Sequence, residues 1–465
     1  MDMPRDDIET LNAWDGDNVL HPWAGSGDFR DRSRLLVEDA KGIHVTTADG
    51  KRLIDGPGGM WCVQIGYGRD EIGQAMAEQA TKLGYYSPFS NSNSTAAQLA
   101  HEIAKRTPGD LNTVFFSTGG SEAVDSAIRF VHFRNNVLGK RQKKKIISRQ
   151  MAYHGSTYLS ASLCGKPRDK NWFDTAEDMV HLLPDVNPYR RAEGQTEAEF
   201  LDEKVADLEN AILEIGPDNT AAFIAEPILA SGGVVIPPAG YHKRCLEICR
   251  KYDVLYISDE VVTGFGRLGH WFASELVFDI VPDIITCAKG LTSGYAPMGA
   301  TIISDRLLDS ITQASDEAVF SNGFTYSGHP VCAAAALKNM EIIEREGILE
   351  HVRAVSPHFL ERLHALGDLP IVGNTRGMGL VGCVECVADK TTKSQLEMDY
   401  TVGGLIDDHC RELGLMLRPL YSMCVFSPPL IITESQIDQM FDILEKGIRL
   451  ASDDLVRQGL WKPAA

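Results

Sequence analysis

The chain has 465 residues, 44% of them hydrophobic and 23% charged, which is the composition of a soluble protein with a large core. Its 45 Lys and Arg residues against 64 Asp and Glu residues give a net charge of −19, which argues against nucleic acids and anionic membranes as general partners. The first residues lack the apolar segment of a signal peptide, no apolar run is long enough to span a bilayer, and ten cysteines in so long a chain indicate reduced thiols, so we expect a cytoplasmic protein.

The N-terminal part, residues 1–61, is expected to form an arm and part of a small domain. An Asp-Gly pair at 49–50 lies between two apolar stretches and predicts a β-hairpin. The Gly- and Pro-rich stretch 55–60 offers little packing for the large side chain of Trp61, which makes Trp61 a candidate wall of a ligand pocket. Further on, an aromatic loop ends at Phe89, and its pattern is equally compatible with core and with pocket residues.

A strand, a glycine-rich turn and a helix are predicted over residues 113–129. The turn is Gly119-Gly120-Ser121, and the helix follows it directly. Free backbone N–H groups and the positive end of the helix dipole meet at such a turn, which suits it to an anion such as a cofactor phosphate. An ordinary helix N-cap has the same pattern, and both descriptions can hold at once.

Two further strands end on side chains that suit a flat cofactor. The strand predicted over 145–149 leads to Tyr153 and His154, and an aromatic side chain at a strand end can stack on a planar ring. A later buried strand ends on Glu226. Between them, residues 165–200 are rich in Pro, Asp, Asn and Tyr, which indicates either an insertion or a lid-like loop.

The next two strands deliver an acid and an amine to the same edge of the predicted sheet. The apolar run 254–258 ends on Asp259 and Glu260, and the run 284–287 leads to Lys289. A desolvated lysine forms Schiff bases with aldehydes, and a buried acid can hold a pyridinium nitrogen, so the pair meets the requirements of pyridoxal 5′-phosphate. Without further context, a surface lysine and a helix-capping acid would explain the same residues.

Other motifs in the chain do not carry a competing function. Residues 264–269 spell G-x-G-x-x-G, but the preceding Asp259 and Glu260 would repel a pyrophosphate, and no P-loop sequence is present. Cys383 and Cys386 spell C-x-x-C on a predicted strand, where their odd separation directs the two thiols to opposite faces. No second pair completes a zinc site, so we expect no metal.

The stretches Asp259-Glu-Val-Val-Thr-Gly-Phe-Gly-Arg267 and Ala288-Lys-Gly-Leu-Thr-Ser-Gly-Tyr295 together resemble the class III pyridoxal-phosphate-dependent aminotransferases. The resemblance covers most of the chain and is greatest to enzymes that transfer amino groups from omega-amino acids or amines to pyruvate. It implies that Lys289, Asp259 and Tyr153 are catalytic. It implies that the cofactor is bound by the following residues: Gly119, Gly120, Ser121, Tyr153, His154, Glu226, Asp259, Val261, Lys289 and, from the partner subunit of a dimer, Thr325.

The same resemblance implies where substrates bind. Arg418 matches the family's mobile arginine, which can clamp a carboxylate through two parallel hydrogen bonds. Ser231 stands where some relatives carry a Glu that pairs with that arginine, so Arg418 is expected to lack a fixed acidic partner. Trp61 and Tyr153 are expected to wall the amine side, with Phe89 and the Trp23 of the N-terminal arm as further pocket candidates. Gly119 departs from the family pattern, which usually has Ser there.

We therefore expect an α/β protein of fold type I, the aspartate-aminotransferase-like architecture. Its large domain, residues 62–330, would hold a mainly parallel sheet, and a smaller α+β domain would combine both termini, including residues 331–465. The expected reaction is amino transfer from an amine or omega-amino acid to pyruvate or a similar 2-oxo acid, in a homodimer or higher oligomer. Two alternatives stay open. An aminomutase of the glutamate-semialdehyde type shares these motifs, and a non-catalytic homologue on the same fold would be expected to lack Lys289 or Asp259.

Overall fold

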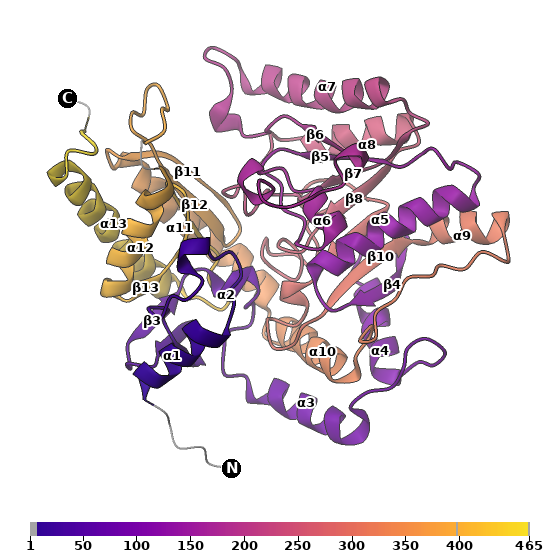
Figure 1. The fold of residues 1–465 in the computed structure, drawn as a ribbon, viewed down its shortest axis with the longest axis horizontal. Helices are drawn as coiled ribbons and strands as arrows, with labels where there is room; N and C mark the ends of the chain where they lie inside the picture. The colour runs from indigo at the N-terminus through magenta and orange to yellow at the C-terminus, as the bar shows by residue number, and fades with distance from the viewer. Residues whose placement is uncertain (1–6, 397–398, 464–465) are drawn as a thin grey trace.

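A seven-stranded sheet forms the centre of the larger lobe in the computed structural model, which describes residues 7–396 and 399–463 (Figure 1). The five strands from β9 to β6 in the sheet order are mutually parallel, and β10 is antiparallel to both of its neighbours. This confirms the predicted mainly parallel α/β sheet. In spatial order the strands are β4 (Leu111–Ser117), β10 (Gly299–Ser304), β9 (Ile284–Cys287), β8 (Leu255–Asp259), β7 (Thr220–Ala225), β5 (Lys145–Arg149) and β6 (Val180–Leu183).

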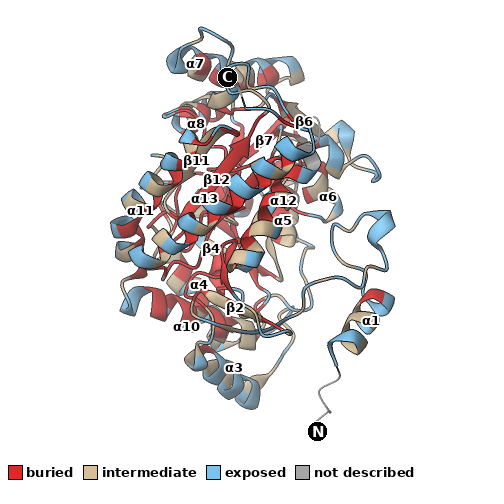
Figure 2. Cartoon of the chain, turned by 90° about the vertical axis from the view of Figure 1, so that its left-hand side faces the viewer, coloured by how far each residue is buried: buried red, intermediate tan, exposed pale blue. Residues whose placement is uncertain are grey.

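The central strands are mainly apolar because helices cover both faces of the sheet. Phe223 and Tyr256 pack on one face with helices α7 (Glu197–Ile215) and α8 (Tyr241–Lys251). Their chain neighbours Ile224 and Ile257 point to the other face, where they pack with helix α5 (Gly120–Val137). The alternation of side chains along a strand therefore decides which helices each residue meets. Figure 2 shows the buried strands between more exposed helices.

The smaller lobe contains two four-stranded sheets and draws on both ends of the chain (Figure 1). In the first sheet, the N-terminal β3 pairs in parallel with the C-terminal β13, and the predicted Asp-Gly hairpin joins β2 to β3. The order of this sheet is β1 (Val37–Lys41), β2 (His44–Thr47), β3 (Arg52–Asp55), β13 (Leu415–Met416). The other is β11 (Val372–Met378), β12 (Val381–Cys386), β15 (Met423–Phe426), β14 (Arg418–Leu420).

The remaining helices pack around the two lobes. Helix α10 packs against α3 and α4 in the larger lobe, and α11, α12 and α13 cover the smaller lobe. The domain boundaries at residues 61 and 330 stay predictions. The bounds are α3 (Asp70–Leu83), α4 (Ser94–Ala104), α9 (Asp305–Ala314), α10 (Pro330–Arg345), α11 (Ile348–Ala365), α12 (Asp399–Leu413) and α13 (Glu434–Arg457), with the short helices α2 (Gly58–Trp61) and α6 (Tyr158–Ser162).

Three local details shape the smaller lobe and the N-terminal arm. The stretch 376–383 turns back at Gly379, whose φ of 58° suits a residue without a side chain. The stretch 415–419 is divided between β13 and β14, which lie in different sheets. The N-terminal arm contains helix α1 (Ile8–Asn18), whose N-cap Asp7 accepts a hydrogen bond from the backbone N–H of Thr10.

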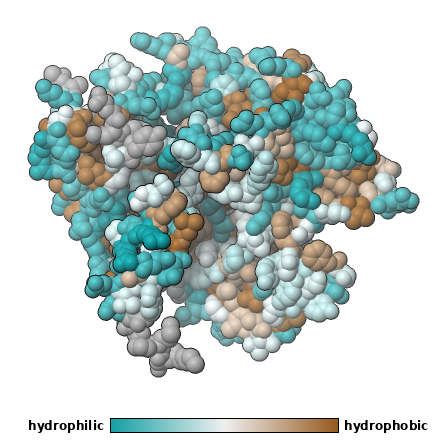
Figure 3. Space-filling model, in the orientation of Figure 1, coloured by the Kyte–Doolittle hydropathy of each residue, from teal (hydrophilic) through white to brown (hydrophobic). Residues whose placement is uncertain are grey.

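Within residues 7–396 and 399–463, no helix has the length and apolar character needed to cross a membrane. The face drawn in Figure 3 is mainly hydrophilic and is hollowed between the two lobes. Cys383 and Cys386 pack in different clusters, as their odd separation on a strand predicts. Residues 1–6, where we expected no signal peptide, lie outside the described part of the chain.

Candidate active site

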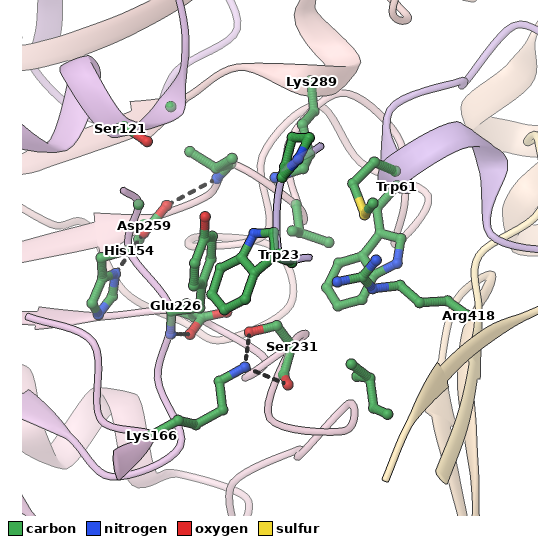
Figure 4. A pocket seen from close by; sticks show the side chains of 18 of the residues that line it. Trp23, Trp61, Ser121, His154, Lys166, Glu226, Ser231, Asp259, Lys289 and Arg418 are labelled. Atoms are coloured by element: carbon green, nitrogen blue, oxygen red, sulfur yellow. Dashed lines mark hydrogen bonds and ion pairs between the residues drawn. The ribbon is translucent and has the colours of Figure 1, made fainter. Parts of the chain in front are cut away.

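A pocket between the two lobes collects most of the predicted site residues (Figure 4). It lies where β7, β8 and β9 end, which is where parallel α/β sheets place their ligands. Side chains from the N-terminal arm and from β14 complete its walls. The lining residues that were predicted from the sequence are Trp23, Trp61, Gly120, Ser121, Tyr153, His154, Glu226, Ser231, Asp259, Val261, Lys289 and Arg418.

Asp259 is buried at the end of β8 and is held by three donors. Its Oδ2 lies 2.6 Å from Nδ1 of His154, and its Oδ1 accepts from the backbone N–H of Val261 and from Oγ1 of Thr286, both at 3.2 Å. These contacts fix the orientation of the carboxylate. The adjacent Glu260 is structural. Its carboxylate accepts hydrogen bonds from the backbone N–H groups of residues 273 and 274, at 2.6 and 2.9 Å, and so anchors a turn.

Lys289 enters the pocket from the turn after β9. Its backbone has φ 39°, a left-handed conformation that is costly for a residue with a side chain and that is concentrated at functional sites. Burial lowers the pKa of its amine, while the negative charge of Asp259 opposes this effect. Among the described residues, its Nζ has no hydrogen-bond or ion-pair partner. A lysine with these properties is a ready nucleophile.

The turn between β4 and α5 forms an anion cradle. The backbone N–H groups of Gly120 and Ser121 open helix α5 and have no partner within residues 7–396 and 399–463. A Cβ built on Gly120 would lie 3.0 Å from a methyl group of Val261, so a side chain there would close the space beside Asp259. Gly119 is the N-cap, in extended conformation, and does not line the pocket. The hydroxyl oxygen of Ser121 accepts a hydrogen bond from the backbone N–H of Ser156 at 3.0 Å.

Tyr153 and Glu226 form the wall that faces this cradle. Glu226 is buried, and its carboxylate accepts from the backbone N–H groups of Tyr153 at 3.0 Å and Ala230 at 3.1 Å. Burial raises the pKa of Glu226 and that of the Tyr153 phenol. The ring of Trp23 lies 6.0 Å from that of Tyr153, so the N-terminal arm reaches over the pocket as the resemblance implied. Trp23 remains 60% exposed, which places it at the mouth.

The other wall comes from Trp61 and the small-lobe strand β14. Trp61 is buried, and the guanidinium of Arg418 lies over its ring, 6.0 Å from the centroid (Figure 4). Within residues 7–396 and 399–463, Arg418 makes no ion pair, and its Nε is buried without a hydrogen-bond partner. Among the described residues, no hydrogen bond joins Ser231 to Arg418. Instead, the carbonyl oxygen and the hydroxyl of Ser231 both accept from Nζ of Lys166 at 3.0 Å.

Phe89 and Thr325 lie outside the pocket of a single chain. Phe89 is 70% exposed, and Thr325 is exposed as well. The two loops that carry them lie together, since the hydroxyl of Tyr85 donates to the carbonyl oxygen of Thr325 at 2.9 Å and a Cβ on Gly323 would touch the Phe89 ring. The assignment of Thr325 to the neighbouring subunit's site stays a prediction, as does that of Phe89 to the substrate pocket.

Sequence reasoning missed several residues of the site, and the polar ones among them are Thr286, Lys166 and Arg168. Thr286 supports Asp259 from the adjacent strand β9, and only strand order reveals that contact. Lys166 and Arg168 line the pocket from the irregular stretch 165–200. Two basic residues on either side of Pro167 were the only signal, and charged residues in a loop are too common to single out a site.

The pocket fits pyridoxal 5′-phosphate by the chemistry of its donors. It combines an unpaired buried amine at Lys289, a carboxylate at Asp259 for a ring nitrogen, and free backbone N–H groups at Gly120 and Ser121 for a phosphate. Tyr153 offers a flat ring, and Val261 fills the space beside Gly120. These are the residues that would hold the cofactor.

Comparisons with known proteins agree with this geometry. The family described as aminotransferase class-III matches residues 29–448. The putrescine–pyruvate aminotransferase of Pseudomonas aeruginosa is 39% identical over 435 residues, covering 92% of this chain and 94% of that protein. The mitochondrial gamma-aminobutyrate transaminase 1 of Oryza sativa subsp. indica is 36% identical over 455 residues, covering 97% and 88%. The crystal structure of an omega transaminase from Pseudomonas jessenii in complex with PMP superposes with a TM-score of 0.93 at 35% identity, covering 96% and 99%.

Proposed function

The chain belongs to the class III aminotransferases, which use pyridoxal 5′-phosphate, and we propose that its amino donor is an amine or omega-amino acid and its acceptor is pyruvate. One observation supports the proposal most directly: the unpaired Lys289 amine, the Asp259 carboxylate and the unpaired guanidinium of Arg418 line the same pocket. The presence of both Lys289 and Asp259 argues against a non-catalytic homologue.

When bound, pyridoxal 5′-phosphate supplies an aldehyde that condenses with amines and a ring that accepts electrons from the carbon bearing the amine. Lys289 serves as the base that moves the proton from that carbon, and its lowered pKa makes the neutral amine accessible. The carboxylate of Asp259, oriented by His154 and Thr286, keeps a proton on the ring nitrogen. The flat ring of Tyr153 and the apolar side chain of Val261, both of which line the pocket, would pack against the cofactor ring.

Arg418 is the proposed partner of the acceptor's carboxylate. A guanidinium forms two parallel hydrogen bonds with a carboxylate, and the buried, unpaired Nε indicates a group that awaits an anion. Donors without a carboxylate need the same space to be apolar, and the face of Trp61 supplies such a surface beside Arg418. One pocket can therefore accept both partners in turn.

We further propose a homodimer in which Thr325 reaches the cofactor phosphate of the neighbouring site. The support is the exposure of an aromatic surface around it: Tyr85, Tyr86, Phe89 and Tyr326 are 40%, 58%, 70% and 55% exposed. An apolar surface of this kind is typical of a protein interface.

A donor panel with pyruvate tests the proposed function. Purified, cofactor-loaded protein should form alanine from pyruvate with at least one primary amine or omega-amino acid. Amine alone should convert the cofactor to its amino form, and pyruvate should restore the starting spectrum. Conversion of an amino aldehyde to its isomer without any acceptor would support the aminomutase alternative instead.

A further inference from the structure

Three cationic side chains besides Lys289 line the pocket: Lys166, Arg168 and Arg418. Lys166 is buried and committed to Ser231 through two hydrogen bonds of 3.0 Å, as Figure 4 shows. Arg418 serves the proposed acceptor site. The position and contacts of Arg168 have no role in the reaction derived above.

Arg168 lies at the mouth of the pocket on the short 3-10 turn Pro167–Asp169. Its side chain is 45% exposed, and its guanidinium carbon lies 4.7 Å from the centroid of the Tyr421 ring, which follows β14 directly. Its Nε lies 3.4 Å from the Oδ1 of Asp169. In the part of the chain that the structure describes, its two terminal nitrogens have no hydrogen-bond partner. The stack on Tyr421 therefore orients a guanidinium whose free edge can meet a ligand.

The local charge balance favours an anion at this place. The side chain of Asp169 is only 4% exposed and lies close to two cations of the same segment. Its carboxylate is 3.6 Å from Nζ of Lys166 and 3.4 Å from Nε of Arg168. Arg418 has no ion pair within residues 7–396 and 399–463. Burial lowers the pKa of Arg418, and the like charge of Arg168 acts in the same direction.

We propose that Arg168, stacked on Tyr421, forms a second anion-binding subsite at the pocket mouth that takes the distal carboxylate of a substrate. The inference rests on the proposed function for one point: the substrate carbon that bears the amino group lies beside the Lys289 amine. Arg418 binds the carboxylate next to the reacting carbon, and Arg168 binds one several bonds further out. A distal ammonium group at the same place would meet the like charge of Arg168 instead, so the subsite also disfavours diamines.

Three donors of matched length test the subsite in the cofactor-loaded enzyme with pyruvate: 4-aminobutanoate, butan-1-amine and 1,4-diaminobutane. We expect kcat/KM for 4-aminobutanoate to exceed that for 1,4-diaminobutane by at least about tenfold, the effect of one charge-assisted hydrogen bond. Arg168→Gln should lower the ratio of 4-aminobutanoate to butan-1-amine by about tenfold or more, and Arg168→Lys should restore part of it. Arg141→Gln, on an exposed loop and not among the lining residues, is the charge-matched control. A ratio that Arg168→Gln leaves unchanged overturns the proposal.

Calorimetric binding of unreactive acids separates this proposal from the proposed function. Pentanedioate has two carboxylates and butanoate has one, so the preference of the wild type for pentanedioate measures the second subsite. We expect that preference to fall by about tenfold or more in Arg168→Gln and to persist in Arg141→Gln. If no donor supports alanine formation but the preference behaves this way, the subsite stands and the proposed function fails. Equal preference in wild type and Arg168→Gln overturns the subsite.

Discussion

Replacing Arg418 by Ala should separate the two acceptor classes of the enzyme. The guanidinium is half-buried, lies over Trp61 and has no acidic partner in the described residues, so nothing in the protein competes with an incoming carboxylate. Two charge-assisted hydrogen bonds contribute roughly 1.5–3 kcal/mol each. Even with half of that offset by hydration of the free groups, about 1.5–3 kcal/mol is lost, which corresponds to about 10- to 150-fold in kcat/KM for pyruvate.

The assay compares pyruvate with butanal, an acceptor that has no carboxylate, with the same amine donor and in the same preparation. Arg418→Ala should change kcat/KM for butanal by no more than about fivefold, because only the contact with the Trp61 ring is lost, worth roughly 0.5–1 kcal/mol. Arg418→Lys keeps the charge without the fork and should fall between wild type and Ala. Equal losses with pyruvate and butanal would remove Arg418 from carboxylate recognition.

Three further predictions concern the residues that would hold the cofactor. Lys289→Ala should abolish transamination and the visible absorbance of the loaded enzyme, and wild-type turnover in this variant would refute the assignment. Thr325→Ala should weaken retention of the cofactor by about tenfold or more, since a hydrogen bond to a charged phosphate contributes roughly 1.5–3 kcal/mol, while circular dichroism stays unchanged; a monomer that retains the cofactor as tightly as the dimer contradicts it. Lys289→Met should stabilise the apoprotein at neutral pH in urea unfolding. Burial lowers the folded-state pKa of Lys289 below its ordinary 10.5, so the unfolded chain binds more protons between the two values and the wild type gains stability as pH rises through that window. The advantage of Met should therefore shrink as pH approaches 10.5, and an advantage that grows with pH would contradict the argument.

The sequence alone predicted the cofactor side of the site because that side depends on strand ends. Apolar runs identify β8 and β9, and the polar residues that follow them, Asp259 and Lys289, lie at one edge of a parallel sheet by a general rule. The glycine turn before α5 is equally local. These features need no knowledge of contacts between distant parts of the chain.

The substrate side could not be predicted in the same way because it depends on contacts between lobes. Tyr421 orients Arg168 although more than 250 positions separate them. Ser231 accepts from Lys166 rather than facing Arg418, and no pattern in either segment indicates that choice. His154 and Asp259 were both expected at the cofactor, but their direct contact of 2.6 Å follows from the packing of β5 and β8 on either side of β7.

The cofactor side and the substrate side of the pocket also differ in how readily substitutions can alter them. Arg267 is fully buried between the lobes and donates to the carbonyl oxygens of Leu380 at 3.0 Å and Pro428 at 2.6 Å, as well as to the side chain of Gln64. Burial lowers the pKa of Arg267 to about 9, so the guanidinium stays protonated at neutral pH. Moving the lobes apart would break its hydrogen bonds to these carbonyl groups and leave the cation without partners. The frame is thus fixed at this junction. A change of substrate is accordingly expected to come from side chains at the mouth, with Arg168 first among them, while the strand-end residues that hold the cofactor stay in place.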